Sequence, residues 1–391
     1  MIIPNGKAKR AWIISDTHFG ARNNSVEWLE RMTLYFEEFF IPHVKENYKK
    51  GDILIHCGDV YDNRQSVNLL VLNKTLNLFE KFSEIFVDGI YVIAGNHDIM
   101  RKNSNEVTSL DTLKYIPNVT ILKEPATLKT KTSTSLLMPW RKSESDEKVV
   151  VSGSDADYLF CHTTIRGAKF DKYRHSGEGL ASKECKQFKK VFTGHIHLAQ
   201  QYKNIRYVGN PYQMTRSDTN NKKGFICLDF ETGTEDFYEN TYSSKFVKLY
   251  INRALDSTMQ DLINASDNNF VDVYVPNDYL MKYQVTPLID ALSKVSKKLD
   301  VIPFELDDNN NLMEYDIDYD KTLDTYNLCE KFVSVDKYPT KILSEINRSS
   351  SILRDIFDND FTGIHVDDSE MQVEIKDYLK TIAPDKESIV K

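Results

Sequence analysis

The sequence predicts an α/β protein whose N-terminal half is built around a parallel sheet. Short apolar segments alternate with long segments whose apolar residues recur every three or four positions. The apolar segments fit buried strands, and the periodic segments fit amphipathic helices that cover the sheet. The composition agrees with a globular protein, since 41% of the 391 residues are hydrophobic and 28% are charged.

The expected elements follow in chain order. Strands are predicted at 11–15, 53–57 and 90–94, and helices at 26–48 and 67–86, where residues such as Leu29, Met32 and Phe36 share one face. From about residue 119 the strands become shorter. A second, mixed sheet is expected from the segments 135–138, 158–161, 191–193, 205–208 and 225–230.

A domain boundary is expected near residue 243. Beyond it, the order strand 247–251, helix 258–265, strand 270–275 and helix 285–299 predicts a small α+β module. A polar, acidic segment then precedes further amphipathic patterns. The predicted organisation is a first domain over 1–243, the module over 244–306, an acidic linker over 307–320 and a helical segment over 321–391.

The net charge of −8 is unevenly distributed. Residues 307–391 contain 20 acidic and 10 basic residues, which leaves 38 acidic and 40 basic residues in the rest of the chain. The first 306 residues are therefore nearly neutral, and a local basic surface for nucleic acid is compatible with this composition.

The cysteine count and the N-terminus both favour a cytoplasmic protein. Five cysteines without a C-x-x-C pair argue against a disulfide framework. The N-terminus lacks a signal-peptide pattern, and no run approaches the ~20 apolar residues of a membrane span. A cytoplasmic location is expected, in the host cytoplasm if the source is viral, with no membrane partner.

Metal-ligand residue types follow the predicted strands. Each strand end is where an open α/β sheet places its ligands. Each motif is weak alone, and a lone histidine is more often structural, as we expect for His56 inside an apolar strand. The motifs are Asp16-Thr17-His18, Gly58-Asp59-Val60-Tyr61-Asp62, Gly95-Asn96-His97-Asp98, His162 and Gly194-His195-Ile196-His197.

The combination of these residue types has a chemical explanation. Carboxylate, imidazole and amide ligands together suit Mn²⁺, Fe or Zn²⁺ better than Ca²⁺. Two metals about 3.5–4 Å apart require a shared ligand, and a carboxylate can bridge them. The sequence therefore predicts two divalent cations, with Mn²⁺ favoured.

The ordered set D-x-H, G-D-x-x-D, G-N-H-D, H and G-H-x-H resembles the calcineurin-like metallophosphoesterases. Within them, Asp98 after His97 and the stretch from Arg206 to Pro211 resemble SbcD-type nuclease subunits and the related recombination endonuclease subunits of phages. Asn210 departs from the small hydroxyl residue usual in that stretch. The resemblance implies a four-layer α/β/β/α sandwich, followed by an α+β module that caps DNA and by C-terminal helices.

The resemblance also implies roles for the motif residues. One metal would be bound by Asp16, His18 and His197, and the other by Asn96, His162 and His195, with Asp59 bridging. His97 would act on the scissile phosphate and protonate the leaving oxygen, with Asp98 orienting it, and Asp62 would support the ligands.

The expected function is that of a metal-dependent DNA exonuclease or endonuclease subunit that processes DNA ends. In SbcD-like systems the partner is an SMC-like ATPase of the SbcC type, which binds a nuclease homodimer within a heterotetramer, and the segment 321–391 would dock it. Basic residues near the motifs can contact DNA phosphates, although solvated surface charge is an equal reading for each. These residues are Arg64, Arg141, Lys169, Lys172 and Arg174.

Two other functions fit the same motifs. A phosphatase for a small molecule or a protein would keep the metal site but would not need the module over 244–306. A non-catalytic DNA-binding subunit would have lost ligands, whereas all seven ligand positions and His97 are present here.

Overall fold

A computed structural model describes residues 1–304 except 102–103, 142, 171–173, 252–256 and 278–284. The chain divides into two compact units, Met1–Asp316 and Ile317–Lys391. The division falls inside the predicted linker 307–320. The helical segment predicted over 321–391 lies outside the described residues, and the predicted domain boundaries remain a prediction.

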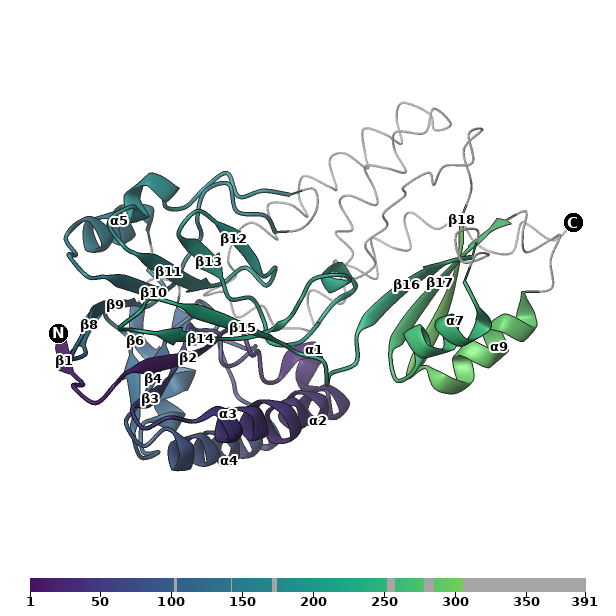
Figure 1. Cartoon of the computed structure of the whole chain (residues 1–391), viewed down its shortest axis with the longest axis horizontal. Helices are drawn as coiled ribbons and strands as arrows, with labels where there is room; N and C mark the ends of the chain where they lie inside the picture. Colours follow the sequence, from purple (N-terminus) through teal and green to yellow (C-terminus); the bar gives the residue numbers. More distant parts are fainter. Residues whose placement is uncertain (102–103, 142, 171–173, 252–256, 278–284, 305–391) are drawn as a thin grey trace, which may run out of the picture. The chain divides into compact units, whose positions relative to one another are not determined.

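Two large sheets form the body of the first unit (Figure 1). In the six-stranded sheet the order is β15 (Glu235–Glu239), β14 (Gly224–Asp229), β2 (Arg10–Ile14), β3 (Asp52–His56), β4 (Ile90–Ile93) and β7 (Val119–Leu122). In the seven-stranded sheet the order is β1 (Ile2–Pro4), β8 (Ala126–Lys129), β9 (Thr134–Met138), β10 (Tyr158–His162), β11 (Lys190–Gly194), β13 (Ile205–Tyr207) and β12 (Gln200–Tyr202).

Helices cover the outer face of each large sheet. On the six-stranded sheet these are α2 (Val26–Tyr35), a π-helical turn η1 (Phe36–Phe40), α3 (Ile41–Asn47) and α4 (Leu69–Ile85). On the seven-stranded sheet they are α5 (Glu144–Ser152) and the 3-10 turn η3 (Ser182–Cys185). The remaining short turns are α1 (Ala21–Asn24), η2 (Ser109–Leu113) and η4 (Arg216–Asp218), and a small hairpin pairs β5 (Ile99–Arg101) with β6 (Ser104–Thr108).

The alternation of side chains along each strand explains the layers. In β3, Leu54 packs into the cluster with the helices, whereas Ile53 and Ile55 pack against the other sheet. In β10, Phe160 joins this central cluster and Leu159 joins a third cluster beside α5. Three apolar layers therefore separate helices, sheet, sheet and helices, and the expected α/β/β/α sandwich is confirmed.

Three details of the expected element order were wrong. The strand expected at 225–230 is β14, which pairs antiparallel with β2 in the first sheet rather than joining the second. The helix expected over 26–48 contains a π-helical turn, η1. The helix expected over 285–299 is α9 (Thr286–Val295), and β18 (Lys298–Phe304) begins three residues later. Apolar residues close to a helix end fit either period, so only pairing with a neighbouring strand distinguishes them.

The predicted α+β module contains a three-stranded parallel sheet. Its strands are β16 (Phe246–Tyr250), β17 (Phe270–Pro276) and β18, and α7 (Met259–Ser266) and α9 contribute to one apolar cluster with them. Trp28 in α2 stacks near Phe270, with ring centroids 5.9 Å apart. Within the described ranges, every helix is too short or too polar to span a bilayer.

Candidate metal centre

Five parallel strands direct the predicted motifs to one region. β2, β3 and β4 run parallel, as do β10 and β11, so each set of motif loops leaves its sheet at the same edge. The loops turn sharply, because Asp16, His18, Asp59 and His195 have φ values of 51°, 46°, 57° and 85°. Such left-handed non-glycine residues cost about 1–3 kcal/mol each and concentrate at functional sites.

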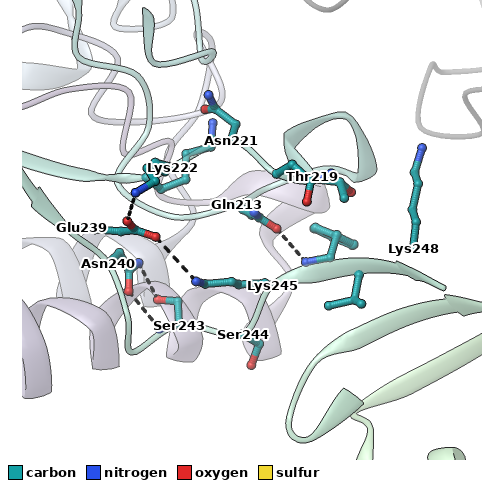
Figure 2. Close-up of a pocket in the computed structure, with 14 residues that line it drawn as sticks. Gln213, Thr219, Asn221, Lys222, Glu239, Asn240, Ser243, Ser244, Lys245 and Lys248 are labelled. Atoms are coloured by element: carbon teal, nitrogen blue, oxygen red, sulfur yellow. Dashed lines mark hydrogen bonds and ion pairs between the residues drawn. The ribbon is translucent and has the colours of Figure 1, made fainter. Parts of the chain in front are cut away.

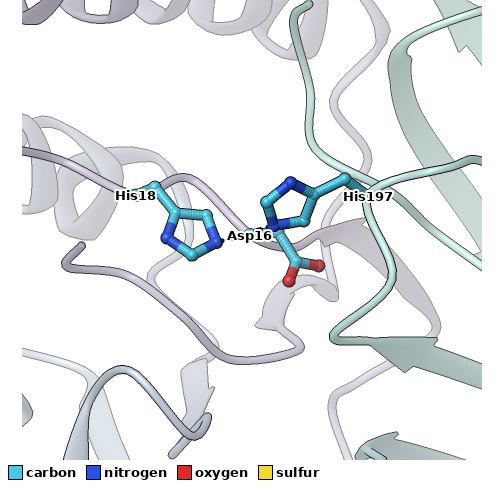
Figure 3. Close-up of side chains that lie close together, drawn as sticks. All are labelled: Asp16, His18 and His197. Carbon is cyan, nitrogen blue, oxygen red and sulfur yellow. Dashed lines mark hydrogen bonds between the residues drawn. The ribbon is translucent and has the colours of Figure 1, made fainter. Parts of the chain in front are cut away.

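Asp16, His18 and His197 form the first group of candidate ligands (Figure 3). The Nε2 atoms of His18 and His197 lie 2.9 Å apart. Asp16 is fully buried, and its Oδ1 accepts a hydrogen bond from the His195 N–H at 3.0 Å, while its Oδ2 has no hydrogen-bond partner among the described residues. An orphaned carboxylate oxygen beside two facing imidazole nitrogens is a donor set that fits a divalent cation.

Asn96, His162 and His195 form the second group. The Oδ1 atom of Asn96 lies 2.9 Å from His162 Nε2 and 2.8 Å from His195 Nδ1. His162 Nδ1 lies 2.8 Å from the carbonyl oxygen of Cys57. Because a carbonyl only accepts, Nδ1 carries the proton and Nε2 is the nitrogen available to a metal. These three residues therefore also present their ligand atoms to a common point.

Asp59 lies between the two groups. Its Oδ2 is 3.7 Å from His18 Nε2 and 3.3 Å from His162 Nε2, so one carboxylate oxygen reaches a ligand of each group. Burial would raise the pKa of Asp59, but His162 and His18 outweigh it and hold the pKa below its usual range. Conversely, burial would lower the pKa of His162, and Asp59 instead raises it to about 9. The two imidazoles therefore favour the ionised form of Asp59, the form in which a carboxylate can bridge two cations.

His97 belongs to neither of these two groups, although it forms a further set of possible ligands with His18 and Asp62. Its Nδ1 lies 2.6 Å from the carbonyl oxygen of Asp62, and its ring centroid is 4.9 Å from that of His18. The Asp62 carboxylate lies 3.1 Å from His18 Nδ1. Asp62 therefore contacts both a candidate ligand and His97, and its supporting role remains a prediction.

The profile of the calcineurin-like phosphoesterase family matches residues 9–199. This range contains both groups of ligands and His97. The chain contains a calcineurin-like metallophosphoesterase domain. A second profile, of the ribonuclease E/G family, matches residues 307–391, which lie outside the described residues.

Comparison with individual proteins adds one curated relative. Exonuclease subunit 1 of Enterobacteria phage T4 is 28% identical over 235 residues, or 58% of this chain and 66% of the relative. The chain thus spans just under two thirds of the length of that relative. Two solved structures are similar to parts of the chain, a novel archaeal phosphodiesterase and a protein of unknown function from Aquifex aeolicus. The match to the archaeal phosphodiesterase covers 59% of this chain and 99% of that structure, with 16% identity and a TM-score of 0.31. The match to the Aquifex aeolicus protein covers 45% of this chain and 86% of that structure, with 21% identity and a TM-score of 0.27.

The structure of this metallophosphoesterase domain shows which groups contact the Asp98 carboxylate, which was predicted to orient His97. Both oxygens of the Asp98 carboxylate accept hydrogen bonds from backbone N–H groups, at distances of 2.8 to 3.2 Å. The donors are Asp59, Val60, Tyr61 and Gly95. The His97 ring is held by the Asp62 carbonyl instead. Asp98 therefore ties the loop that carries Asp59 to the loop that carries Asn96.

Two contacts of the metal centre were not predicted. The Trp140 ring, which follows β9, lies 4.8 Å from the His195 ring. The Nζ atom of Lys223 lies 2.7 Å from the carbonyl oxygen of His197. Neither residue belongs to a motif, and a lone tryptophan or lysine carries no signal of such a contact in the sequence. The sequence did identify His56 as a satisfied core residue, since its ring nitrogens bond to Thr17 and to the Gly58 N–H.

Two of the residues predicted to contact DNA, Arg64 and Arg141, are close in sequence to residues of the metal centre, and two others, Lys169 and Arg174, lie on an exposed loop. Arg141 pairs with Glu124 at 2.6 Å and follows Trp140, and Arg64 lies two residues after Asp62. Lys169 and Arg174 are exposed on the loop after β10. Lys172 lies outside the described residues. The role of these residues in binding DNA remains a prediction.

Proposed function

We propose that this chain is the nuclease subunit of a DNA-processing complex and hydrolyses phosphodiester bonds with two divalent cations. The observation that carries the proposal is the convergence of seven candidate ligands, in two groups with Asp59 between them. Its relationship to a phage exonuclease subunit supports DNA as the substrate. The ligand set suits Mn²⁺.

The cations would supply a hydroxide at neutral pH and neutralise charge on the phosphate. Asp16, His18 and His197 would hold one cation, Asn96, His162 and His195 the other, and Asp59 both. His97 Nδ1 donates a hydrogen bond to the Asp62 carbonyl, which fixes the ring and directs Nε2 to the substrate. In its imidazolium form, which carries a proton on each nitrogen, His97 would donate a hydrogen bond from Nε2 to the phosphate. It would then pass the Nε2 proton to the leaving oxygen and remain neutral, with its other proton on Nδ1.

The proposal extends to partners. The relative from phage T4 is named as a subunit, which supports assembly into a complex. We propose an SMC-like ATPase of the SbcC type as the partner, bound to a homodimer of this chain. Its docking site would be the acidic segment 321–391, because a segment of that charge would repel DNA. The module over 244–306 would cap the DNA.

The test compares His97→Gln and Asp59→Asn in the full chain, with His175→Gln as a matched control. His175 is exposed and outside both ligand groups. We expect His97→Gln to retain two Mn²⁺ and to cleave linear duplex DNA about 10²–10⁴-fold more slowly, the usual contribution of a positioned acid. Asp59→Asn should lose both metal and activity, and the control should lose neither.

The alternative function is separated by substrate. Wild-type protein loaded with Mn²⁺ is assayed on linear duplex DNA, nucleotides and a phosphopeptide. Cleavage of the phosphopeptide or the nucleotides but not of DNA would show a phosphatase and overturn the nuclease proposal. Equal metal loss in His97→Gln and Asp59→Asn would overturn the division of roles. Co-purification with a large ATPase tests the partner.

A further inference from the structure

Lys223 is a buried lysine next to the metal centre. It directly precedes β14, is 3% exposed, and has two polar partners in the described part of the chain. Its Nζ donates to the carbonyl oxygen of His197 at 2.7 Å and pairs with Asp218 Oδ1 at 2.5 Å. A buried ion pair contributes little more net stability than apolar side chains of the same size. Two apolar side chains in place of Lys223 and Asp218, however, could not form the hydrogen bond to the carbonyl oxygen of His197.

Asp218 and Asn221 lie in the same loop and hold two different stretches of backbone. Asp218 Oδ2 accepts hydrogen bonds from the N–H groups of Met214 and Thr215 at 2.9 and 3.0 Å. Asn221 bonds to both backbone groups of Ala199, accepting from its N–H at 3.1 Å and donating to its carbonyl oxygen at 3.2 Å. We call residues 215–223 the supporting loop. It fixes the backbone at His197 and again two residues later.

The supporting loop borders a cavity of about 310 Å³. Figure 2 shows Asn221 and Lys222 on one side of this cavity and Ser243, Ser244 and Lys245 on another. Close packing normally fixes a buried segment. Because side chains do not fill the space on this side of the supporting loop, polar contacts take a larger share in holding the loop itself.

We propose that Lys223, held by Asp218, is a positioning residue for the metal ligand His197. Its ammonium fixes the carbonyl of His197 and so keeps the imidazole Nε2 opposite that of His18. Without this bond, the backbone at His197 is held less firmly and the ring leaves the first ligand group. The second group, of Asn96, His162 and His195, makes no contact with the supporting loop among the described residues and should keep its cation.

The proposal rests on the proposed binding of two metal ions, and metal binding is therefore its readout. Groups that support a metal ligand contribute about 10–100-fold in metal affinity. In the double variant Lys223→Met with Asp218→Asn, both charges are removed together, so neither is left buried and unpaired. We expect one of the two Mn²⁺ ions to bind about 10–100-fold more weakly, and the other to bind as in the wild type.

The experiment titrates Mn²⁺ into metal-free full-length protein by calorimetry and follows the same titration by electron paramagnetic resonance. In the wild type, two ions sharing Asp59 should give the spectrum of an exchange-coupled pair. At matched concentration the double variant should show isolated Mn²⁺. The control, Arg10→Met with Asp52→Asn, removes another buried pair, 2.6 Å long and with side chains 13% and 0% exposed. It should be less stable to urea but bind Mn²⁺ normally.

The outcomes separate this proposal from the proposed function. If wild-type protein binds no Mn²⁺, the proposed function fails and the positioning role fails with it. If the wild type binds two ions and the double variant binds both with unchanged affinity, only the positioning role is overturned. If the double variant does not fold, the more conservative pair Lys223→Gln with Asp218→Asn replaces it, since it also removes both charges and its glutamine is one bond shorter than the lysine. It should weaken one ion several-fold, and unchanged affinity would overturn the proposal.

Discussion

Replacing Asp98 with asparagine should destabilise the fold. The Asp98 carboxylate accepts four backbone hydrogen bonds, two on each oxygen. An asparagine of the same shape has one carbonyl oxygen, so two of the four donors lose their acceptor and face an amide N–H₂ group instead. Asp98 is fully buried, and water cannot replace the lost acceptor.

The magnitude follows from the two donors that are left. A buried donor without a partner costs about 1–3 kcal/mol. Asp98→Asn should therefore lower the free energy of unfolding by about 2–6 kcal/mol, a large part of the ~5–15 kcal/mol of a typical domain. Burial and the charge of Asp59 raise the pKa of Asp98 to about 7, so the comparison belongs at about pH 8, where the wild-type carboxylate is ionised.

The assay is urea denaturation of metal-free protein, followed by circular dichroism. Asp229→Asn is the matched control, because Asp229 accepts from the N–H groups of Glu231 and Thr232 through Oδ1 alone. Asparagine keeps that oxygen, and its effect should stay under about 0.5 kcal/mol. If Asp98→Asn is as stable as this control and loses only DNA cleavage, Asp98 acts through His97 and our assignment is wrong.

Two further predictions concern close packing and a buried acid. A Cβ atom on Gly95 would lie 2.2 Å from Asp59 Oδ1, so Gly95→Ala should displace Asp59 and lower the Mn²⁺ content, whereas Gly177→Ala, with nothing within 4 Å, should not. Burial raises the pKa of Glu147 from its ordinary 4.5 to about 7, so the folded state binds the extra proton, and Glu147 should lower the stability by about 3 kcal/mol as the pH rises from 4.5 to 8. In urea denaturation with EDTA, Glu147→Gln should reduce the fall by this amount and leave the part due to Asp98. An unchanged pH profile would refute the assignment.

The sequence by itself determined which residues could bind metal and roughly where the strands lie. An apolar segment ends at, or just before, each of five candidate ligands: Asp16, Asp59, Asn96, His162 and His195. Such segments can be recognised as buried strands because the local pattern of apolar residues shows which strands are buried. Parallel strands end at a common edge, so the position of these residues in the sequence already implied that they meet. Ligand chemistry then limited the choice of cation.

Only the tertiary structure decided how segments distant in the chain pair with one another. In it, β14 pairs with β2 in the first sheet. Four backbone N–H groups, and not His97, bond to the Asp98 carboxylate, and Lys223 bonds to the carbonyl oxygen of His197. Each of these contacts joins residues far apart in the chain, and the local sequence around neither residue indicates which partner it contacts. The hydrophobic pattern of the sequence shows whether a residue is buried. The hydrogen-bond partner of a buried polar group, in contrast, depends on which backbone segment lies next to it once the two sheets have packed together.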